Sequence, residues 1–160
     1  MDYLWSPWRY KYISEASKND RCIFCDALAL ADDRKALIVH RGRQNFVILN
    51  RFPYTTGHVM IVPFAHIADL AGCDAATLSE MMHLAQRVET ALTANYQPEG
   101  FNLGMNVGRC AGAGVAGHIH LHVLPRWTGD TNFMTAVGET RLEPEDLSLT
   151  FDKLSRSLAS

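Results

Sequence analysis

Apolar side chains recur at the spacing of one helical face between residues 74 and 96 of this chain. About every third or fourth position is apolar, which is typical of a helix that packs one side against a core. Asp74 stands before the first of them as an N-cap, and the segment 97–100, Gln-Pro-Glu-Gly, ends the pattern. The pattern therefore predicts one long helix with a buried face made of Leu78, Met81, Met82, Ala85, Val88, Ala91 and Leu92.

Shorter runs rich in β-branched and aromatic residues predict strands on both sides of this helix. The predicted strands cover residues 36–40, 45–50, 58–63, 101–107 and 118–125. A short helix is expected through Ala31, and a weak one is expected to begin at Pro144. Hairpin-connected strands with one long helix inserted between them indicate an α+β domain on an antiparallel sheet.

The composition is that of a soluble globular protein. The chain has 160 residues, of which 48% are hydrophobic and 20% charged, and this length is enough to bury one core. No apolar run approaches the roughly 20 residues of a membrane helix, and the aromatic N-terminus lacks the apolar region of a signal peptide. We therefore expect one cytoplasmic domain with no membrane partner.

The formal net charge of −2 argues against binding to long nucleic acids, because such binding depends on clustered Lys and Arg. The basic residues are scattered, as at Arg9, Lys11, Arg41 and Arg43. A small anionic substrate held by local groups is compatible with this charge.

Three histidines alternate with apolar residues in the run from His118 to His122. Alternate side chains of a strand share a face, so the three imidazoles would project together while the residues between them face a core. A neutral imidazole is both a nucleophile and a metal ligand near neutral pH. The run therefore indicates a chemical site, whereas His40 and His83, which stand alone, are expected to be ordinary surface or core histidines.

A glycine-rich segment, residues 108–117, leads directly into the histidine run. Glycines let backbone N–H groups approach phosphate oxygens closely. The segment lacks the Lys and Ser/Thr of a P-loop, which excludes a Walker-type site. Its position favours a phosphate cradle, and a flexible connection is the alternative.

Cys22 and Cys25 supply two thiols at the spacing of a zinc knuckle. His66 and one histidine of the run could complete a tetrahedral Cys₂His₂ site. A redox pair and plain buried thiols are the alternatives, although the strand that precedes the thiols in a thioredoxin-like unit is absent from the pattern. A hydrolytic metal site of the H-x-H-x-D-H type is disfavoured, because Leu121 stands where the aspartate would be.

The run His118-Ile-His120-Leu-His122-Val-Leu matches the mark of the histidine triad (HIT) family without a gap. Residues 46–58 resemble the nucleoside-binding strand and turn of one branch, and the cysteine pair with His66 is similar to the zinc site of the bacterial Hint-like branch. Residues 5–13 and 125–133 are most similar to bacterial diadenosine tetraphosphate phosphorylases and their relatives.

The resemblance implies a HIT fold, which is a five-stranded antiparallel sheet with one long helix and short helices, paired into a homodimer or homotetramer. It divides the chain into an N-terminal extension (1–20), a HIT domain (21–135) and a C-terminal tail or helix (136–160). The implied chemistry is hydrolysis or transfer at the α-phosphate of an adenine nucleotide, such as diadenosine tetraphosphate, through a nucleotidyl-histidine intermediate.

By motif position the resemblance also assigns roles to single residues. His120 would be the nucleophile, His122 and His58 would orient it and contact phosphate, and His118 would sit beside them or ligate zinc. The substrate contacts would be Asn50 for ribose, Phe24 and Ile48 for an apolar adenine pocket, and Asn106, Gly112, Ala113 and Gly114 for phosphate. The metal set would be Cys22, Cys25, His66 and His118, with zinc as a structural cofactor.

One departure from the family pattern precedes the histidines. The common Gly-Gln-Ser/Thr-Val-x-His is replaced by Gly-Ala-Gly-Val-Ala-Gly-His at residues 112–118, one residue longer and without either polar side chain. Backbone amides must then do more of the phosphate binding, and the acceptor stays open between water and inorganic phosphate.

Other functions stay open as well. The chain could hydrolyse nucleoside phosphoramidates or adenylylated small molecules, or it could be a zinc-stabilised nucleotide-binding protein with vestigial catalysis. A role at DNA ends is disfavoured because the basic surface is missing.

Overall fold

Five strands form one antiparallel sheet in the order β1-β2-β3-β5-β4 in the computed structural model, which describes residues 21–131 and 145–159. The strands are β1 (Ile38–Arg41), β2 (Asn45–Leu49), β3 (Val59–Pro63), β4 (Gly100–Gly104) and β5 (Leu121–Arg126). The helices are α2 (Ile23–Ala29), α3 (Asp33–Ala36), α4 (Ala75–Tyr96) and α6 (Leu147–Ala159), with a 3₁₀ turn η1 at Arg109–Ala111. The predicted α+β fold, a five-stranded antiparallel sheet with one long helix and short helices, is confirmed.

Some expectations are not tested by this structure. The extension 1–20 and the start of the C-terminal helix at Pro144 lie outside the described residues. The domain boundaries and the pairing into a dimer or tetramer stay predictions.

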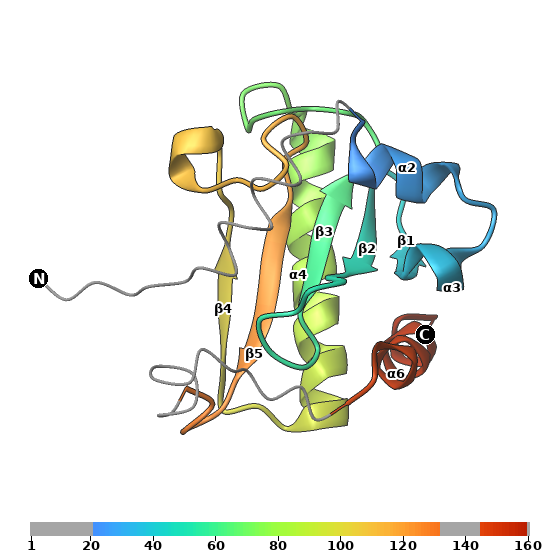
Figure 1. Cartoon of the computed structure of the whole chain (residues 1–160), viewed down its shortest axis with the longest axis vertical. Helices are drawn as coiled ribbons and strands as arrows, with labels where there is room; N and C mark the ends of the chain where they lie inside the picture. The colour runs from blue at the N-terminus through green and yellow to red at the C-terminus, as the bar shows by residue number, and fades with distance from the viewer. Residues whose placement is uncertain (1–20, 132–144, 160) are drawn as a thin grey trace, which may run out of the picture.

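The sheet has a core on each face. All five residues of β2 and of β3 are buried, so these central strands are covered on both sides. Val47, Leu49 and Ile61 pack with the buried side of α4, which lies behind the sheet in Figure 1. Phe46, Ile48, Met60 and Val62 belong to a second cluster with Phe24 of α2 on the opposite face. The second face is the one on which the histidines lie.

Helix α4 begins and ends as predicted. The side chain of Asp74 accepts a hydrogen bond from the Thr77 amide at 2.7 Å, which caps the first turn. Met81, Ala85 and Val88 are buried against the sheet as expected. The prediction that Met82 is buried is wrong: 55% of this residue is exposed, because it lies one position beyond the buried stripe.

The C-terminal helix α6 is part of the main core. Leu154 and Leu158 are each 1% exposed and belong to the same cluster as α4 and the sheet. The Arg87 guanidinium on α4 reaches both the His40 imidazole and the Leu158 carbonyl oxygen. Both side-chain packing and this bridge hold α6 in place.

Three predicted strand boundaries are wrong. The strand predicted over residues 101–107 is β4, which ends at Gly104. The strand predicted from residue 36 begins at Ile38, because Asp32 caps an additional short helix, α3, that ends at Leu37 in the left-handed region (φ 64°). The strand predicted from His118 begins at Leu121, opposite Ile61. Pro63 ends β3 and has no N–H to donate, so the ladder does not continue toward His118.

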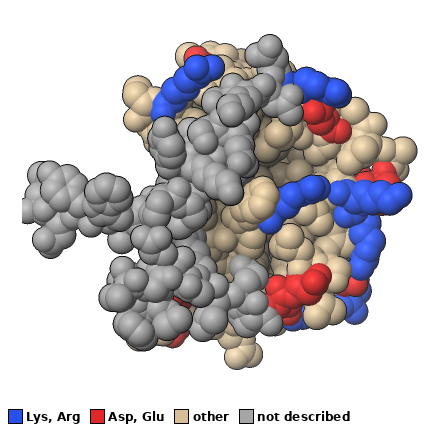
Figure 2. Space-filling model, viewed as in Figure 1, with Lys and Arg blue, Asp and Glu red and all other residues tan. Residues whose placement is uncertain are grey.

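Figure 2 shows the charges on the sheet face seen in Figure 1. Among the described residues, basic and acidic side chains are interspersed along the margin and no single basic patch is visible. Several are paired, as Arg34 is with Asp152 and Arg41 is with Asp33. Within residues 21–131 and 145–159, no helix has the length and apolar character that crossing a membrane requires.

Candidate functional site

The structure gathers four histidines on the sheet face opposite α4. The ring centroids of His120 and His122 are 4.8 Å apart, and those of His58 and His122 are 5.1 Å apart. His58, His118 and His120 are at most 5% exposed. His122 is on β5, whereas His118 and His120 precede the strand, so hydrogen bonds to carbonyl groups rather than the pleat alone orient their rings.

The protonation pattern of His120 follows from its backbone partner. Its Nδ1 lies 2.9 Å from the carbonyl oxygen of His118, and a carbonyl only accepts, so Nδ1 carries the hydrogen. The lone pair of the neutral ring is therefore on Nε2. Burial lowers the pKa of His120 below its ordinary value, although the bond to the carbonyl acts in the opposite direction. The ring is therefore neutral and oriented at pH 7, the state in which an imidazole can act as a nucleophile.

A second chain of hydrogen bonds fixes His122. The amide of Tyr54 donates to Nδ1 of His58 at 3.1 Å, so the hydrogen of His58 is on Nε2. That Nε2–H donates to Nδ1 of His122 at 2.9 Å. His122 therefore carries its hydrogen on Nε2 and can donate it to an anionic ligand.

The turn before His58 requires glycine at position 57. Gly57 has φ 80°, a backbone conformation that residues other than glycine rarely adopt. A Cβ there would also come within 2.8 Å of the Leu92 side chain. The glycine thus lets the turn close against α4 and brings the Tyr54 amide to the His58 ring.

Phe24 connects α2 to the histidines. Its ring is 1% exposed and lies 5.0 Å from the His120 centroid and 5.4 Å from that of His118. This packing excludes water from one side of the His120 ring and so contributes to the burial that lowers the pKa of His120.

Cys22, Cys25, His66 and His118 are brought together in a cluster. Their ligand atoms all lie within 4.8 Å of one another. Nδ1 of His118 lies 3.3 Å from Sγ of Cys22 and 3.7 Å from Sγ of Cys25, and Nδ1 of His66 lies 3.4 Å from Sγ of Cys25. Nε2 of His118 donates to the Pro63 carbonyl at 2.9 Å, which directs Nδ1 toward the thiols.

The electrostatics of this cluster suit a cation. Burial, together with the neighbouring Cys22, raises the pKa of Cys25 and so disfavours a thiolate without a positive charge beside it. Burial also lowers the pKa of His118, while its bond to Pro63 acts against that shift, and the lowered pKa favours the neutral ring that metal ligation requires. The geometry and the two shifts favour metal ligation over a redox pair.

The predicted substrate-binding residues lie around the histidines in different settings. Ile48 is 6% exposed in the cluster that contains Phe24. Asn50 follows β2, and its side-chain oxygen accepts from the Phe52 amide at 2.9 Å. Asn106 lines a hollow of about 210 Å³ together with Tyr54, Asn102, Leu103, Gly104, Met105, His122 and Leu124.

The glycine-rich loop is partly occupied by its own hydrogen bonds. The Gly112 amide donates to the Arg109 carbonyl at 3.0 Å, and the Ala113 amide donates to the Gly108 carbonyl at 3.4 Å. A phosphate would have to compete with these bonds or use other amides, such as that of Gly114. Phosphate binding by this loop stays a prediction.

Sequence reasoning missed Tyr54 and Pro63. Tyr54 acts through its amide and also stacks on His58, with ring centroids 4.8 Å apart. Pro63 acts through its carbonyl oxygen on His118. Their backbone groups leave no side-chain pattern, and only the position of Tyr54 in the turn before His58 could have drawn attention to it.

Comparison with known proteins places this geometry in a family context. The family model of the HIT domain matches residues 32–129. The chain is 35% identical over 150 residues to an "AP-4-A phosphorylase" of Mycobacterium tuberculosis, covering 89% of this chain and 76% of that protein.

Solved structures with the same fold include two histidine triad proteins. A hypothetical histidine triad nucleotide-binding protein from Sulfolobus tokodaii superposes with a TM-score of 0.68 at 26% identity, covering 86% of this chain and 92% of that one. A Zn-bound histidine triad family protein from Mycobacterium smegmatis gives a TM-score of 0.63 at 26% identity, covering 93% and 92%.

Proposed function

This chain belongs to the HIT family, and we propose that it cleaves dinucleoside polyphosphates, such as diadenosine tetraphosphate, at the α-phosphate. The observation that carries the proposal is the orientation of His120, whose Nδ1–H is held by the His118 carbonyl while Nε2 bears the lone pair. The similarity to a protein named for phosphorolysis of this substrate class supports the choice of substrate.

In the proposed first step, Nε2 of His120 attacks the α-phosphorus. A P–N bond forms, the bond from the α-phosphorus to the bridging oxygen breaks, and the electron pair leaves with the departing nucleoside polyphosphate. The imidazole becomes positively charged, and the His118 carbonyl stabilises that charge through Nδ1–H. Covalent catalysis replaces one difficult displacement by two easier ones.

His122 is proposed to stabilise the departing oxygen. Its Nε2–H is available in this tautomer because His58 donates to Nδ1, and a hydrogen bond to an anionic oxygen is stronger than one between neutral groups. In the second step, an oxygen of water or inorganic phosphate forms a bond to the α-phosphorus, the P–N bond breaks and its electron pair returns to Nε2, which restores the neutral His120 ring. When water is the acceptor, the proton that it loses passes to the solvent.

The nucleoside half of the substrate is proposed to lie on the β2 side of His120. Asn50 would contact the ribose, and Phe24 and Ile48 belong to the apolar cluster beside which the base would pack. Asn106, with Gly112, Ala113 and Gly114, would contact phosphate from the β4 side.

We propose zinc as the ion of the Cys22, Cys25, His66 and His118 cluster. Tetrahedral zinc with bonds of 2.3 Å to sulfur and 2.0–2.1 Å to nitrogen places a sulfur and a nitrogen ligand about 3.5–3.6 Å apart. The three sulfur–nitrogen distances of 3.3, 3.4 and 3.7 Å fit that arrangement. Four protein ligands leave no open position, so the ion would hold α2 against the segment before β5 rather than take part in the reaction.

The decisive experiment is incubation of diadenosine tetraphosphate with the protein, with and without inorganic phosphate, followed by chromatography of the products. ADP plus ATP formed only with phosphate identifies a phosphorylase, whereas AMP plus ATP under both conditions identifies a hydrolase. We expect His120→Ala to lower kcat by about 1,000-fold or more, and the exposed His83 on α4 gives a matched control, His83→Ala. Absence of products, or full turnover by His120→Ala, would contradict the proposal.

A further inference from the structure

The hollow beside His122 is a groove between β4 and β5 on the histidine face, and we call it the β4–β5 groove. Its members are Tyr54, Asn102, Leu103, Gly104, Met105, Asn106, His122 and Leu124. The strand register places Gly104 opposite His122 and Asn102 opposite Leu124. The groove therefore starts at His122 and continues along β5 by about 6.6 Å, the rise of two residues.

The size of the groove suits part of a ligand. Its volume of about 210 Å³ is below the roughly 300–1,000 Å³ of pockets that enclose a whole small molecule. Because His122 is shared between the groove and the histidine cluster, a ligand in the groove would be continuous with one at His120.

The reaction proposed at His120 indicates which part of the substrate would occupy the groove. The attacking and leaving atoms of a phosphoryl transfer lie roughly in line on opposite sides of phosphorus. Phe24 covers one side of His120, in the apolar cluster shared with β2. The β4–β5 groove lies toward β4, past His122. With the nucleoside half on the β2 side of His120, as proposed above, the departing half would extend toward this groove.

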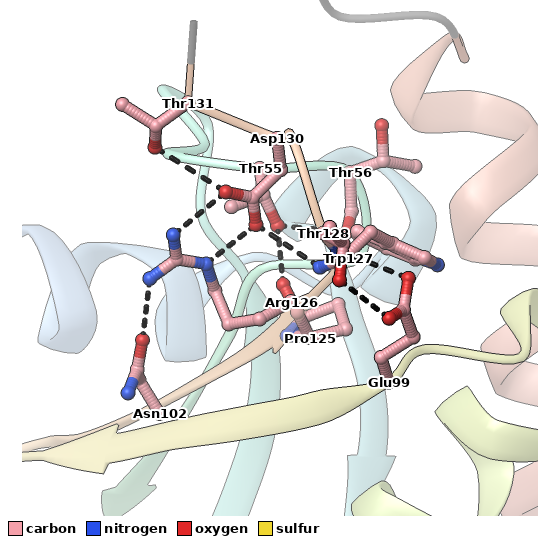
Figure 3. A network of polar contacts seen from close by, with 10 residues as sticks. All are labelled: Thr55, Thr56, Glu99, Asn102, Pro125, Arg126, Trp127, Thr128, Asp130 and Thr131. Atoms are coloured by element: carbon pink, nitrogen blue, oxygen red, sulfur yellow. Dashed lines mark hydrogen bonds and ion pairs between the residues drawn. The ribbon is translucent and has the colours of Figure 1, made fainter.

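Asn102 is held by a neighbouring ion pair. The Nε and Nη2 groups of Arg126 donate to the carboxylate of Asp130 at 2.6 and 2.7 Å, and its Nη1 group donates to Oδ1 of Asn102 at 2.6 Å. Figure 3 shows this network, with the amide nitrogen of Asn102 on the side away from Arg126. Arg126 also holds the pKa of Asp130 well below its usual range, so the pair stays ionised near neutral pH.

The orientation of the Asn102 amide follows from the chemistry of arginine. A guanidinium has only donors, so the oxygen of Asn102 must face Arg126 and the NH₂ group must face away from it. Asp130 compensates the charge of Arg126. Asn102 thus presents a neutral donor above a floor formed by Leu124 and Gly104.

We propose that the β4–β5 groove binds the leaving half of the substrate and that Asn102, positioned by Arg126, donates a hydrogen bond to an acceptor on it. This inference rests on the proposed function, because it takes the α-phosphate to lie at His120. Asn102 is a specificity-determining residue, and Arg126 is a positioning residue.

The test compares three ligands that share one AMP half. The ligands are AMP, α,β-methylene-ATP, and diadenosine tetraphosphate with methylene groups in both α,β bridges, which cannot be cleaved at the α-phosphate. Calorimetry gives the Kd of each for the wild type and for Asn102→Ala. We expect the diadenosine analogue to bind about 10-fold more weakly to Asn102→Ala, the effect of one hydrogen bond to a charged or strongly polar group, with the Kd of AMP unchanged.

The methylene-ATP result identifies the acceptor. An equal loss for this ligand means that Asn102 contacts the polyphosphate, and a loss confined to the diadenosine analogue means that it contacts the second nucleoside; either supports the groove assignment. The groove assignment is overturned if Asn102→Ala weakens the binding of AMP equally, or if the Kd of no ligand changes. We expect Arg126→Ala to cause a smaller loss with the same ligand dependence.

Two glycines of β4 provide a blocking variant and its control. A Cβ on Gly104 or on Gly100 would meet no atom within 4 Å, so both positions accept a side chain. Gly104 lines the groove, whereas Gly100 pairs with Arg126 beyond it. Gly104→Val should weaken the binding of the diadenosine analogue more than that of AMP, and Gly100→Val should not.

Failure of this inference is distinguishable from failure of the proposed function. A wild type that binds all three ligands but does not turn over diadenosine tetraphosphate contradicts the function, while the ratios of Kd values still decide the groove. A wild type that binds none of the ligands overturns both.

Discussion

Replacing Phe24 by alanine should destabilise the protein and change the titration of His120. The ring is 1% exposed and packs on both His118 and His120. A buried Phe→Ala change costs about 3–5 kcal/mol, since it removes apolar contact and leaves a cavity. That is a large share of the roughly 5–15 kcal/mol by which a domain of this size is stable, so urea unfolding at pH 7 measures it directly.

The same change should raise the pKa of His120. Burial lowers that pKa in the wild type, and a cavity that admits water restores it toward about 6.5. Because the folded wild type favours the neutral ring, this contribution to stability is present above pH 6.5 and is lost as the pH falls through the folded-state pKa. The stability difference between wild type and Phe24→Ala should therefore narrow below pH 6.5.

Activity gives an independent readout of Phe24. The acid limb of kcat/KM for diadenosine tetraphosphate should lie below pH 6.5 in the wild type and move upward in Phe24→Ala. Phe24→Leu, which keeps most of the volume, should lose less than about 1.5 kcal/mol and shift the limb less. A loss of stability below 1 kcal/mol, or an acid limb that does not move, would refute the packing argument.

Three further predictions concern the metal cluster, the histidine pair and the β1–β2 turn. Prolonged chelation, or Cys25→Ser, should lower Tm, because an ion bound only by the folded state stabilises that state. Cys73→Ser is the control outside the cluster, and a metal-loaded preparation whose Tm does not change on chelation would contradict the zinc proposal. His58→Ala should lower kcat about 10-fold through loss of the hydrogen bond that fixes His122, and His58→Gln, which retains a donor, should recover part of it; equal kcat in all three proteins would contradict this role. Burial raises the pKa of Glu80, but hydrogen bonds from the Arg43, Gln44 and Asn45 amides and the Asn45 side chain outweigh it and lower the pKa overall. The stabilising effect of the Glu80 carboxylate should be present above about pH 4.3 and be lost as the pH falls through its folded-state pKa. In urea unfolding, Glu80→Gln should cost about 1–3 kcal/mol at pH 7 and make the free energy of unfolding less dependent on acidic pH; an unchanged pH dependence would contradict this role of Glu80.

The sequence predicted those elements whose signals are local. Asp74 and the helical spacing after it give both the start and the end of α4, whereas Met82 shows that spacing alone does not define the width of the buried stripe. The start of β5 was missed because it depends on Pro63, which lies on the neighbouring strand and is distant in sequence. Register is a property of a strand pair, and one strand read by itself does not contain it.

The candidate site shows the same division. The spacing of Cys22 and Cys25 predicted a pair of thiols close to His66 and one histidine of the run, and the structure brings His118 to them. Tyr54 acts on His58 through a backbone amide that every residue but proline has, so no side-chain pattern indicates it. Asn102 is an unremarkable residue of an edge strand until Arg126, 24 residues later, sets the direction of its amide.

His118 serves its two neighbours with different parts of the residue. The imidazole points to the thiols, but what it gives to His120 is the carbonyl oxygen of the main chain. Every amino acid provides that oxygen, so the orientation of His120 depends on the backbone conformation at position 118 and not on the identity of its side chain. Under the proposed roles, the Cys/His cluster and the nucleophile are therefore separable by mutation. A variant that exchanged Cys22, Cys25, His66 and the His118 ring for a packed apolar set, and kept the backbone of residue 118 in place, would keep the bond that orients His120.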